Sequence, residues 1–189
     1  VAIRRALEKI KLSEKDIDTV FAGDLLNQCI SSSFAARGMD IPFIGMFGAC
    51  STMALSAITA SLSIESGGMG ICIAATSSHF CSAEKQFRFP LEYGGQRTPT
   101  AQRTVTGAGA LVLSDSSAGV NPVIKAVHPG TVEDLGITDS TNMGAAMAPA
   151  AWETIKRHFC DFNVNSDDFD LIVTSSNVYL FISFILSLK

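Results

Sequence analysis

PFIGMFGACSTM, residues 42–53, carries an apolar run into a turn and a helical pattern out of it. The run at 42–47 is typical of a buried strand, and the small residues of 52–64 indicate a helix that packs closely in the interior. Cys50 therefore lies near the N-terminus of a predicted helix. Free N–H groups and the helix dipole at such a position favour anions and can lower the pKa of a thiol. Cys50 is either a nucleophile or the floor of an anion-binding pocket.

On both sides of this turn, apolar runs of strand length alternate with helical patterns. The runs are residues 19–23, 41–47, 70–76, 105–113, 122–127 and 170–174, and the helical patterns are residues 3–12, 27–37, 52–65 and 150–162. This alternation predicts an α/β fold, with a mostly parallel or mixed sheet covered by helices on both faces. In such folds, ligands bind outside the carboxyl ends of the strands.

Polar residues follow three of the predicted strands and so predict a binding site at that edge of the sheet. Asp24 ends the first strand, Cys50 and Ser51 follow the second, and His79 follows the third. The hydroxyl group of Ser51 and the N–H groups of the helix start are suitable donors for a carboxylate. His79 fits either a donor to a ligand or a structural hydrogen-bonding residue.

Each of these residues has an alternative, structural interpretation. Cys50 fits a small buried hydrophobic residue, a pocket residue or an acyl nucleophile. Asp24 fits the N-cap of the helix predicted at 27–37, and capping can coexist with a role in the pocket. A carboxylate that faces an anionic ligand needs a shared proton or a bridging cation such as Ca²⁺.

Composition excludes several classes of function. The net charge of the 189 residues is −4 and no basic cluster is present, which argues against nucleic acid as a partner. The five cysteines form no CxxC pair, so we expect reduced thiols in an intracellular protein and no metal site.

Two further segments leave alternatives open. The loop expected at 84–103 is either a solvated loop or a surface for an anion, a partner or lipid headgroups. The apolar run VYLFISFILSL, residues 178–188, is too short to cross a membrane. It reads as a buried strand, as an edge covered by a partner, or as an artefactual chain end.

The motifs resemble the thiolase superfamily, in which a cysteine at the tip of a strand begins a buried helix. Within it, the chain closely resembles the stage V sporulation protein AD family of spore-forming Firmicutes, from about residue 1 to residue 174. The segments that carry the resemblance are GDLLNQ (23–28), FGACSTM (47–53), AATSSHF (74–80), EKQFRFPLEYGGQ (84–96), TVTGAGALVLSD (104–115) and DLGITDSTNMGAAMAPAA (134–151).

The resemblance implies a thiolase-like fold in a non-catalytic protein of the spore germination apparatus. It implies peripheral association with the spore inner membrane, partners in a channel complex there, and binding of dipicolinic acid, pyridine-2,6-dicarboxylate. Carried over by position, the ligand-binding residues are Asp24, Cys50 and Ser51, to which we add His79 as a candidate. We expect no cofactor, with Ca²⁺ entering only as the dipicolinate chelate, and a homodimer is a further expectation.

The chain departs from the family pattern at both ends, so we expect a partial copy. We expect a first thiolase-like half at 1–118 that lacks its first strand, the start of a second half at 119–174, and a divergent apolar tail at 175–189. The second half normally supplies groups that face the cysteine. Its absence favours a binding protein over the runner-up, a condensing enzyme of the thiolase or ketoacyl-synthase type with Cys50 as nucleophile. A third alternative is a scaffold with a vestigial pocket.

Overall fold

The computed structural model describes residues 1–87, 104–115, 122–139 and 143–173. The chain divides into two compact units, Val1–Asp115 and Ser116–Lys189, which are described separately below. Of the predicted features, most of the loop at 84–103 and the apolar tail lie outside the described residues.

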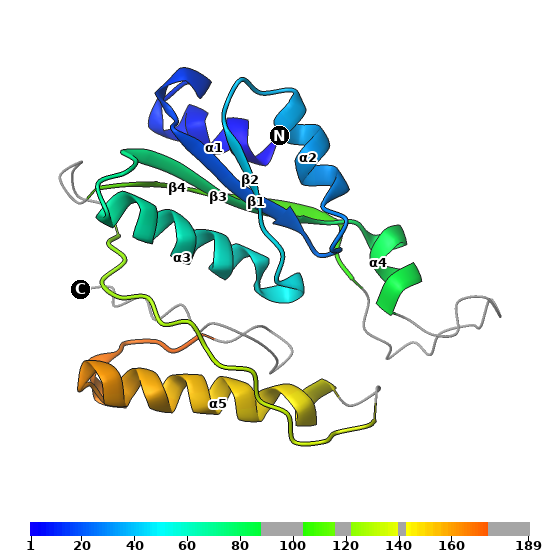
Figure 1. Ribbon diagram of the computed structural model, residues 1–189, viewed down its shortest axis with the longest axis vertical. Coiled ribbons are helices and arrows are strands. Elements are labelled where there is room, and N and C mark those ends of the chain that lie inside the picture. The colour runs from blue at the N-terminus through cyan, green and yellow to red at the C-terminus, as the bar shows by residue number, and fades with distance from the viewer. Residues whose placement is uncertain (88–103, 116–121, 140–142, 174–189) are drawn as a thin grey trace. The chain divides into compact units, whose positions relative to one another are not determined.

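The first unit contains a four-stranded mixed sheet in the order β2-β1-β3-β4 (Figure 1). Strands β1 (Thr19–Asp24), β2 (Phe43–Gly45) and β3 (Ile71–Ser78) are parallel, whereas β4 (Gly107–Ser114) runs antiparallel to β3. The predicted mixed sheet is therefore confirmed for this unit. The structure shortens the strand expected at 41–47 to three residues.

Helices cover both faces of this sheet, as predicted. Figure 1 shows α1 (Ala2–Ile10) and α2 (Ile30–Arg37) on one face and α3 (Thr52–Glu65) on the other. The bounds of α3 agree with the sequence prediction. Helix α4 (Phe80–Phe87) follows β3 directly, so residues 84–87, expected in a loop, are helical.

The core lies on both sides of β1, whose six residues are all buried. Val20 packs with Leu7 and Ile73 on the side of α1 and α2, whereas Phe21 packs with Ala60 of α3 on the other side. Because successive side chains of a strand point to opposite faces, a strand buried on both faces is apolar throughout. This explains why residues 19–23 read as a continuous apolar run.

The second unit contains α5 (Met143–Phe162) and a short 3₁₀ turn, Ser166–Asp168. The helix begins seven residues earlier than predicted and includes Pro149, because the alanines and methionines before the proline are good helix formers. The prediction of a strand at 122–127 is wrong, since residues 122–139 form no strand or helix. Likewise, residues 170–172 form no strand, and Val173 is a single bridge residue.

Within the described ranges, no helix has both the length and the apolar character needed to cross a membrane.

Candidate functional site

The carboxyl ends of β1 and β3 and the start of α3 meet at one edge of the sheet. Asp24 is paired in register with Ser77, the last but one residue of β3. The hydroxyl group of Thr52 lies 3.5 Å from the backbone carbonyl oxygen of Asp24. The ends of the first and third predicted strands and the start of the predicted helix at 52–65 therefore lie together, whereas a binding site there stays a prediction.

The carboxylate of Asp24 binds the start of α2. Its Oδ2 accepts a hydrogen bond from the Ser31 amide at 2.6 Å, and its Oδ1 accepts from the Ser32 amide at 3.1 Å. The Ser77 hydroxyl donates to the same Oδ1 at 2.7 Å. Residue Cys29, which occupies the N-cap position of α2 with a φ of 50°, makes no side-chain capping bond. Asp24 therefore caps α2 from β1, and both of its oxygen atoms are engaged by protein donors.

The turn before α3 is held by its own hydroxyl groups. Ser51 Oγ donates to the carbonyl oxygen of Gly48 at 2.7 Å, and Thr52 Oγ1 donates to that of Ala49 at 2.8 Å. A Cβ atom on Gly48 would lie 2.4 Å from Ser51 Oγ, so a larger residue there would displace this hydroxyl group. The Ser51 hydroxyl proton, which was expected to serve a ligand, is thus used inside the turn, and a ligand at Ser51 meets mainly the hydroxyl oxygen.

Two backbone donors of this turn remain open. In the part of the chain that the structure describes, the amides of Ala49 and Cys50 have no acceptor apart from the Cys50 thiol itself. Ala49 has a φ of 49°, in the left-handed region that non-glycine residues seldom adopt. The turn Ala49–Ser51 is a 3₁₀ helix that runs directly into α3, so these amides lie at the positive end of a 14-residue helix.

Cys50 is exposed as a residue, but its thiol is not activated. Protein atoms around the sulfur exclude water and raise the pKa of Cys50 above its ordinary value, and a hydrogen bond with its own amide offsets only part of the rise. Helix position alone suggested a shift in the opposite direction. Desolvation of the thiolate outweighs the helix terminus, so the thiol is neutral at neutral pH.

His79 lies apart from this turn. It follows β3, is exposed, and its backbone carbonyl oxygen accepts a hydrogen bond from the Ala83 amide at 3.0 Å, in the first turn of α4. Its side chain makes no described contact with Asp24 or Cys50. A ligand role for His79 stays a prediction.

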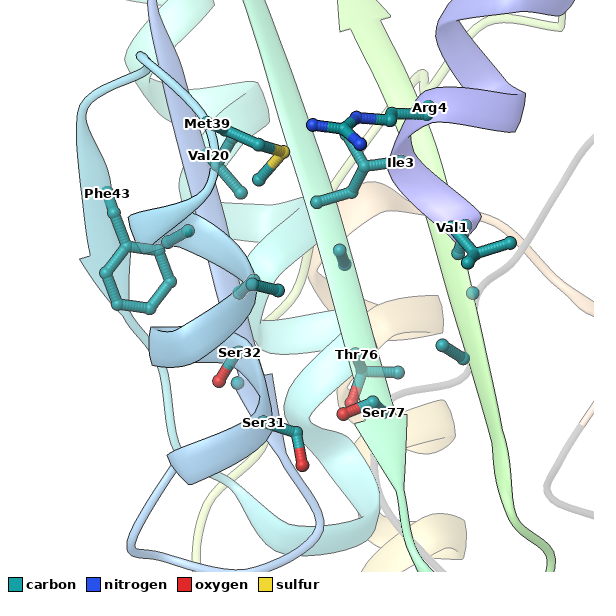
Figure 2. A pocket seen from close by; sticks show the side chains of 18 of the residues that line it. Val1, Ile3, Arg4, Val20, Ser31, Ser32, Met39, Phe43, Thr76 and Ser77 are labelled. Atoms are coloured by element: carbon teal, nitrogen blue, oxygen red, sulfur yellow. The ribbon is translucent and has the colours of Figure 1, made fainter.

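A cavity of about 290 Å³, which sequence reasoning missed, lies between α1, α2 and the sheet. Figure 2 shows the hydroxyl groups of Ser31, Ser32 and Thr76 at one end, and Val20, Met39 and the guanidinium group of Arg4 at the other. None of the four predicted site residues lines it. The run of serines at 31–33 was the signal in the sequence that polar atoms gather at this end of α2.

Among the described residues, no group of three or more His, Cys, Asp or Glu side chains is arranged to hold a metal ion.

Comparisons with known proteins identify the family of the chain and its fold. The family model for stage V sporulation protein AD matches residues 1–178. Stage V sporulation protein AD of Bacillus subtilis (strain 168) is 50% identical over 173 residues, covering 92% of this chain and 51% of the relative. The chain thus spans about half the length of that relative.

Two solved structures share the fold. A tetronic acid condensing enzyme superposes with a TM-score of 0.60 at 18% identity, over 91% of this chain and 60% of its own. The 3-oxoacyl-[acyl-carrier-protein] synthase III of Aquifex aeolicus VF5 has a TM-score of 0.60 at 14% identity, over 89% of this chain and 56% of its own. At these identities the likeness shows the thiolase-like α/β fold alone. On its sequence, the chain belongs to the stage V sporulation protein AD family.

Proposed function

We propose that the chain is a non-catalytic binding protein of the sporulation and germination apparatus, which binds dipicolinate or its Ca²⁺ chelate at the turn before α3. The observation that carries the proposal is the pair of open amides at Ala49 and Cys50 beside a thiol whose pKa is raised. Such a turn is equipped to bind a carboxylate and is poorly equipped to attack a thioester.

Dipicolinate fits the chemistry of this turn. It is a planar dianion at neutral pH, so one carboxylate can accept from the two amides at the positive end of α3. Cys50, beside those amides, is a small and exposed residue, so the aromatic ring can approach them from solvent. Asp24, whose oxygen atoms are bound by Ser31, Ser32 and Ser77, acts by holding the edge of the sheet in place. The Ca²⁺ chelate reduces the repulsion between this carboxylate and the ligand.

The family suggests where this binding takes place. We propose peripheral association with the spore inner membrane, as one component of a channel complex whose other proteins are its partners, and pairing of two copies as a homodimer. Sedimentation of the purified chain tests the homodimer, and co-purification with the other complex components tests the assembly. A monomer that co-purifies with none of them would contradict this part of the proposal.

Calorimetric titration of the chain with dipicolinate, with and without Ca²⁺, tests the binding site. We expect Cys50→Phe to abolish binding by filling the space beside the two amides, and Cys50→Ala to weaken it by up to about tenfold, equivalent to about 1.4 kcal/mol. Cys81→Ala, which removes another exposed cysteine of the same unit, is the matched control and should bind as the wild type does. Pyridine-2,4-dicarboxylate has the same charge but a different geometry, so it tests for non-specific attraction of anions.

Two outcomes would overturn the proposal in different ways. Equal affinity in wild type and Cys50→Phe would remove the turn before α3 from the site. No binding by wild type, with the chain folded by circular dichroism, would contradict dipicolinate binding by this chain.

A condensing enzyme with Cys50 as acyl nucleophile is the second candidate, favoured by the likeness of the fold to two condensing enzymes. Incubation with acyl-CoA followed by mass spectrometry of the intact chain separates the two functions. We expect no acyl adduct, and an adduct that disappears in Cys50→Ala would establish the enzyme instead.

A further inference from the structure

Residues 122–139, here called the strap, lie along α5 in the second unit and contact it at three places. A Cβ atom on Gly130 would lie 2.6 Å from Thr154 Oγ1, so the strap backbone approaches the helix closely there. Arg157 Nη2 lies 3.5 Å from Glu133 Oε1. His128 Nδ1 lies 3.5 Å from Asp161 Oδ2, near the end of α5. The strap has no secondary structure of its own, and these contacts hold it against α5.

The last contact contains two facing histidines. The rings of His128 and His158 have centroids 5.8 Å apart in an edge-to-face arrangement. His158 is only 8% exposed, and its ring packs 4.6 Å from that of Phe162 and 6.0 Å from that of Phe169. One imidazole comes from the strap, the other from α5, and the aromatic rings around His158 provide no counter-charge.

We propose that His128 and His158 form an acid-sensitive latch, which holds the strap on α5 while His158 is neutral and releases it when both imidazoles carry protons. The proposal concerns the second unit alone and does not depend on dipicolinate binding.

The charged groups around the latch explain its direction. The strap contributes His128 and Glu133, and α5 contributes Asp161, Arg157 and Glu153, but both glutamates are already paired with Arg157. Phe169, from the segment after the 3₁₀ turn, contributes no charge. Asp161 can therefore balance one imidazolium, whereas the second would be left among phenylalanine rings beside a like charge.

The pKa of His158 agrees with this geometry. Burial lowers the pKa of His158 and the nearby His128 lowers it further, while Asp161 partly opposes the shift. A histidine with a lowered pKa in the folded state binds fewer protons there than in the released state. The latch is therefore most stable above the ordinary histidine value of about 6.5, and it weakens as the pH falls below that value.

Hydrogen exchange of the full-length chain, followed by mass spectrometry from about pH 7.5 to pH 5, tests the latch. After correction for intrinsic exchange rates, we expect protection of peptides from the strap to fall on acidification. At most, the protection of these peptides falls by about tenfold per pH unit for each proton that the strap takes up on release. Peptides from β1 and β3 in the first unit serve as the internal reference and should keep their protection.

Variants assign the response to the latch. His158→Leu and His128→Gln should each flatten the pH dependence of the strap's protection. Asp161→Asn removes the counter-charge of the latch, so its strap should lose more protection at acidic pH than the wild-type strap does. The chain has three histidines, so His79→Gln is the matched control and should respond as the wild type does. Should His158→Leu fail to fold at pH 7.5, His128→Gln decides the question, because its imidazole is less buried. A wild-type strap without pH dependence, or the same dependence in His128→Gln, would overturn the proposal.

Discussion

Replacing Asp24 with alanine should destabilise the first unit, because its carboxylate accepts hydrogen bonds from the amides of Ser31 and Ser32 and from the hydroxyl of Ser77. Hydrogen bonds to a charged group contribute about 1.5–3 kcal/mol each, so the three bonds together suggest an upper limit of roughly 9 kcal/mol. Water can solvate part of the helix start once the carboxylate is gone, because Ser31 is only half-buried. We therefore expect a loss of about 3 kcal/mol for Asp24→Ala. For Asp24→Asn we expect about half of that, since the amide oxygen still accepts and the amide nitrogen can donate to Ser77.

Urea denaturation followed by circular dichroism measures this loss. Hydrogen exchange of peptides from α2 serves as a local probe, because a chain of two units need not unfold in one step. A double-mutant cycle with Ser77→Ala should give a coupling energy of about 1 kcal/mol. The same cycle with Ser33→Ala, whose hydroxyl binds the Cys29 carbonyl oxygen instead, should give none. An Asp24→Ala variant within about 0.5 kcal/mol of wild type would refute the capping role and leave the carboxylate free for a ligand.

Three further predictions concern other parts of the first unit. Gly23→Ala should destabilise by at least about 3 kcal/mol in urea denaturation, because its Cβ would lie 1.8 Å from the Met46 carbonyl oxygen. The control Gly38→Ala, whose nearest atom would be 3.6 Å away, should stay within about 1 kcal/mol of wild type, and equal effects would contradict the steric explanation. Iodoacetamide should alkylate Cys50 at pH 7 several-fold more slowly than it alkylates glutathione, and the rate should rise with pH, because desolvation raises the pKa of Cys50. Peptide mass spectrometry measures this rate. Alkylation as fast as that of glutathione would contradict a neutral thiol. Hydrogen bonds from the Ile71 and Gly70 amides lower the pKa of Asp18 in the folded state. The ionised Asp18 therefore stabilises the fold at a pH above its unfolded-state pKa of about 3.8, and this contribution is lost as the pH falls through its folded-state pKa. Asp18→Asn should accordingly lose less stability than wild type between pH 5 and pH 2, and an unchanged acid dependence would exclude this contribution.

The sequence predicted the buried elements correctly where a single pattern, apolar or small residues, ran through the whole segment. The apolar run at 19–23 and the small-residue helix at 52–65 each predict a buried element, and the structure contains both. Their order along the chain also predicted that Asp24 and the turn at Cys50 reach the same edge of the sheet, because parallel strands end together.

The details of the site depended on contacts between distant residues, which local patterns do not encode. Ser77, which binds Asp24 from 53 residues away, is one example. The pKa of Cys50 is another, because helix position suggests a lowered value while packing around the sulfur raises it. In the second unit, the run at 122–127 resembled a strand, yet the segment that contains it packs along α5.

The order of strands in the sheet has a consequence for how the chain folds as it is synthesised. Strand β1 is made first, but its partners β2 and β3 are parallel to it and follow only after intervening helices. No two neighbouring strands of this sheet form a tight hairpin, so a nascent chain cannot complete the sheet from local contacts. The apolar β1 stays without its second neighbour until Ser78 has left the ribosome, which predicts slow folding and a need for chaperones in that interval.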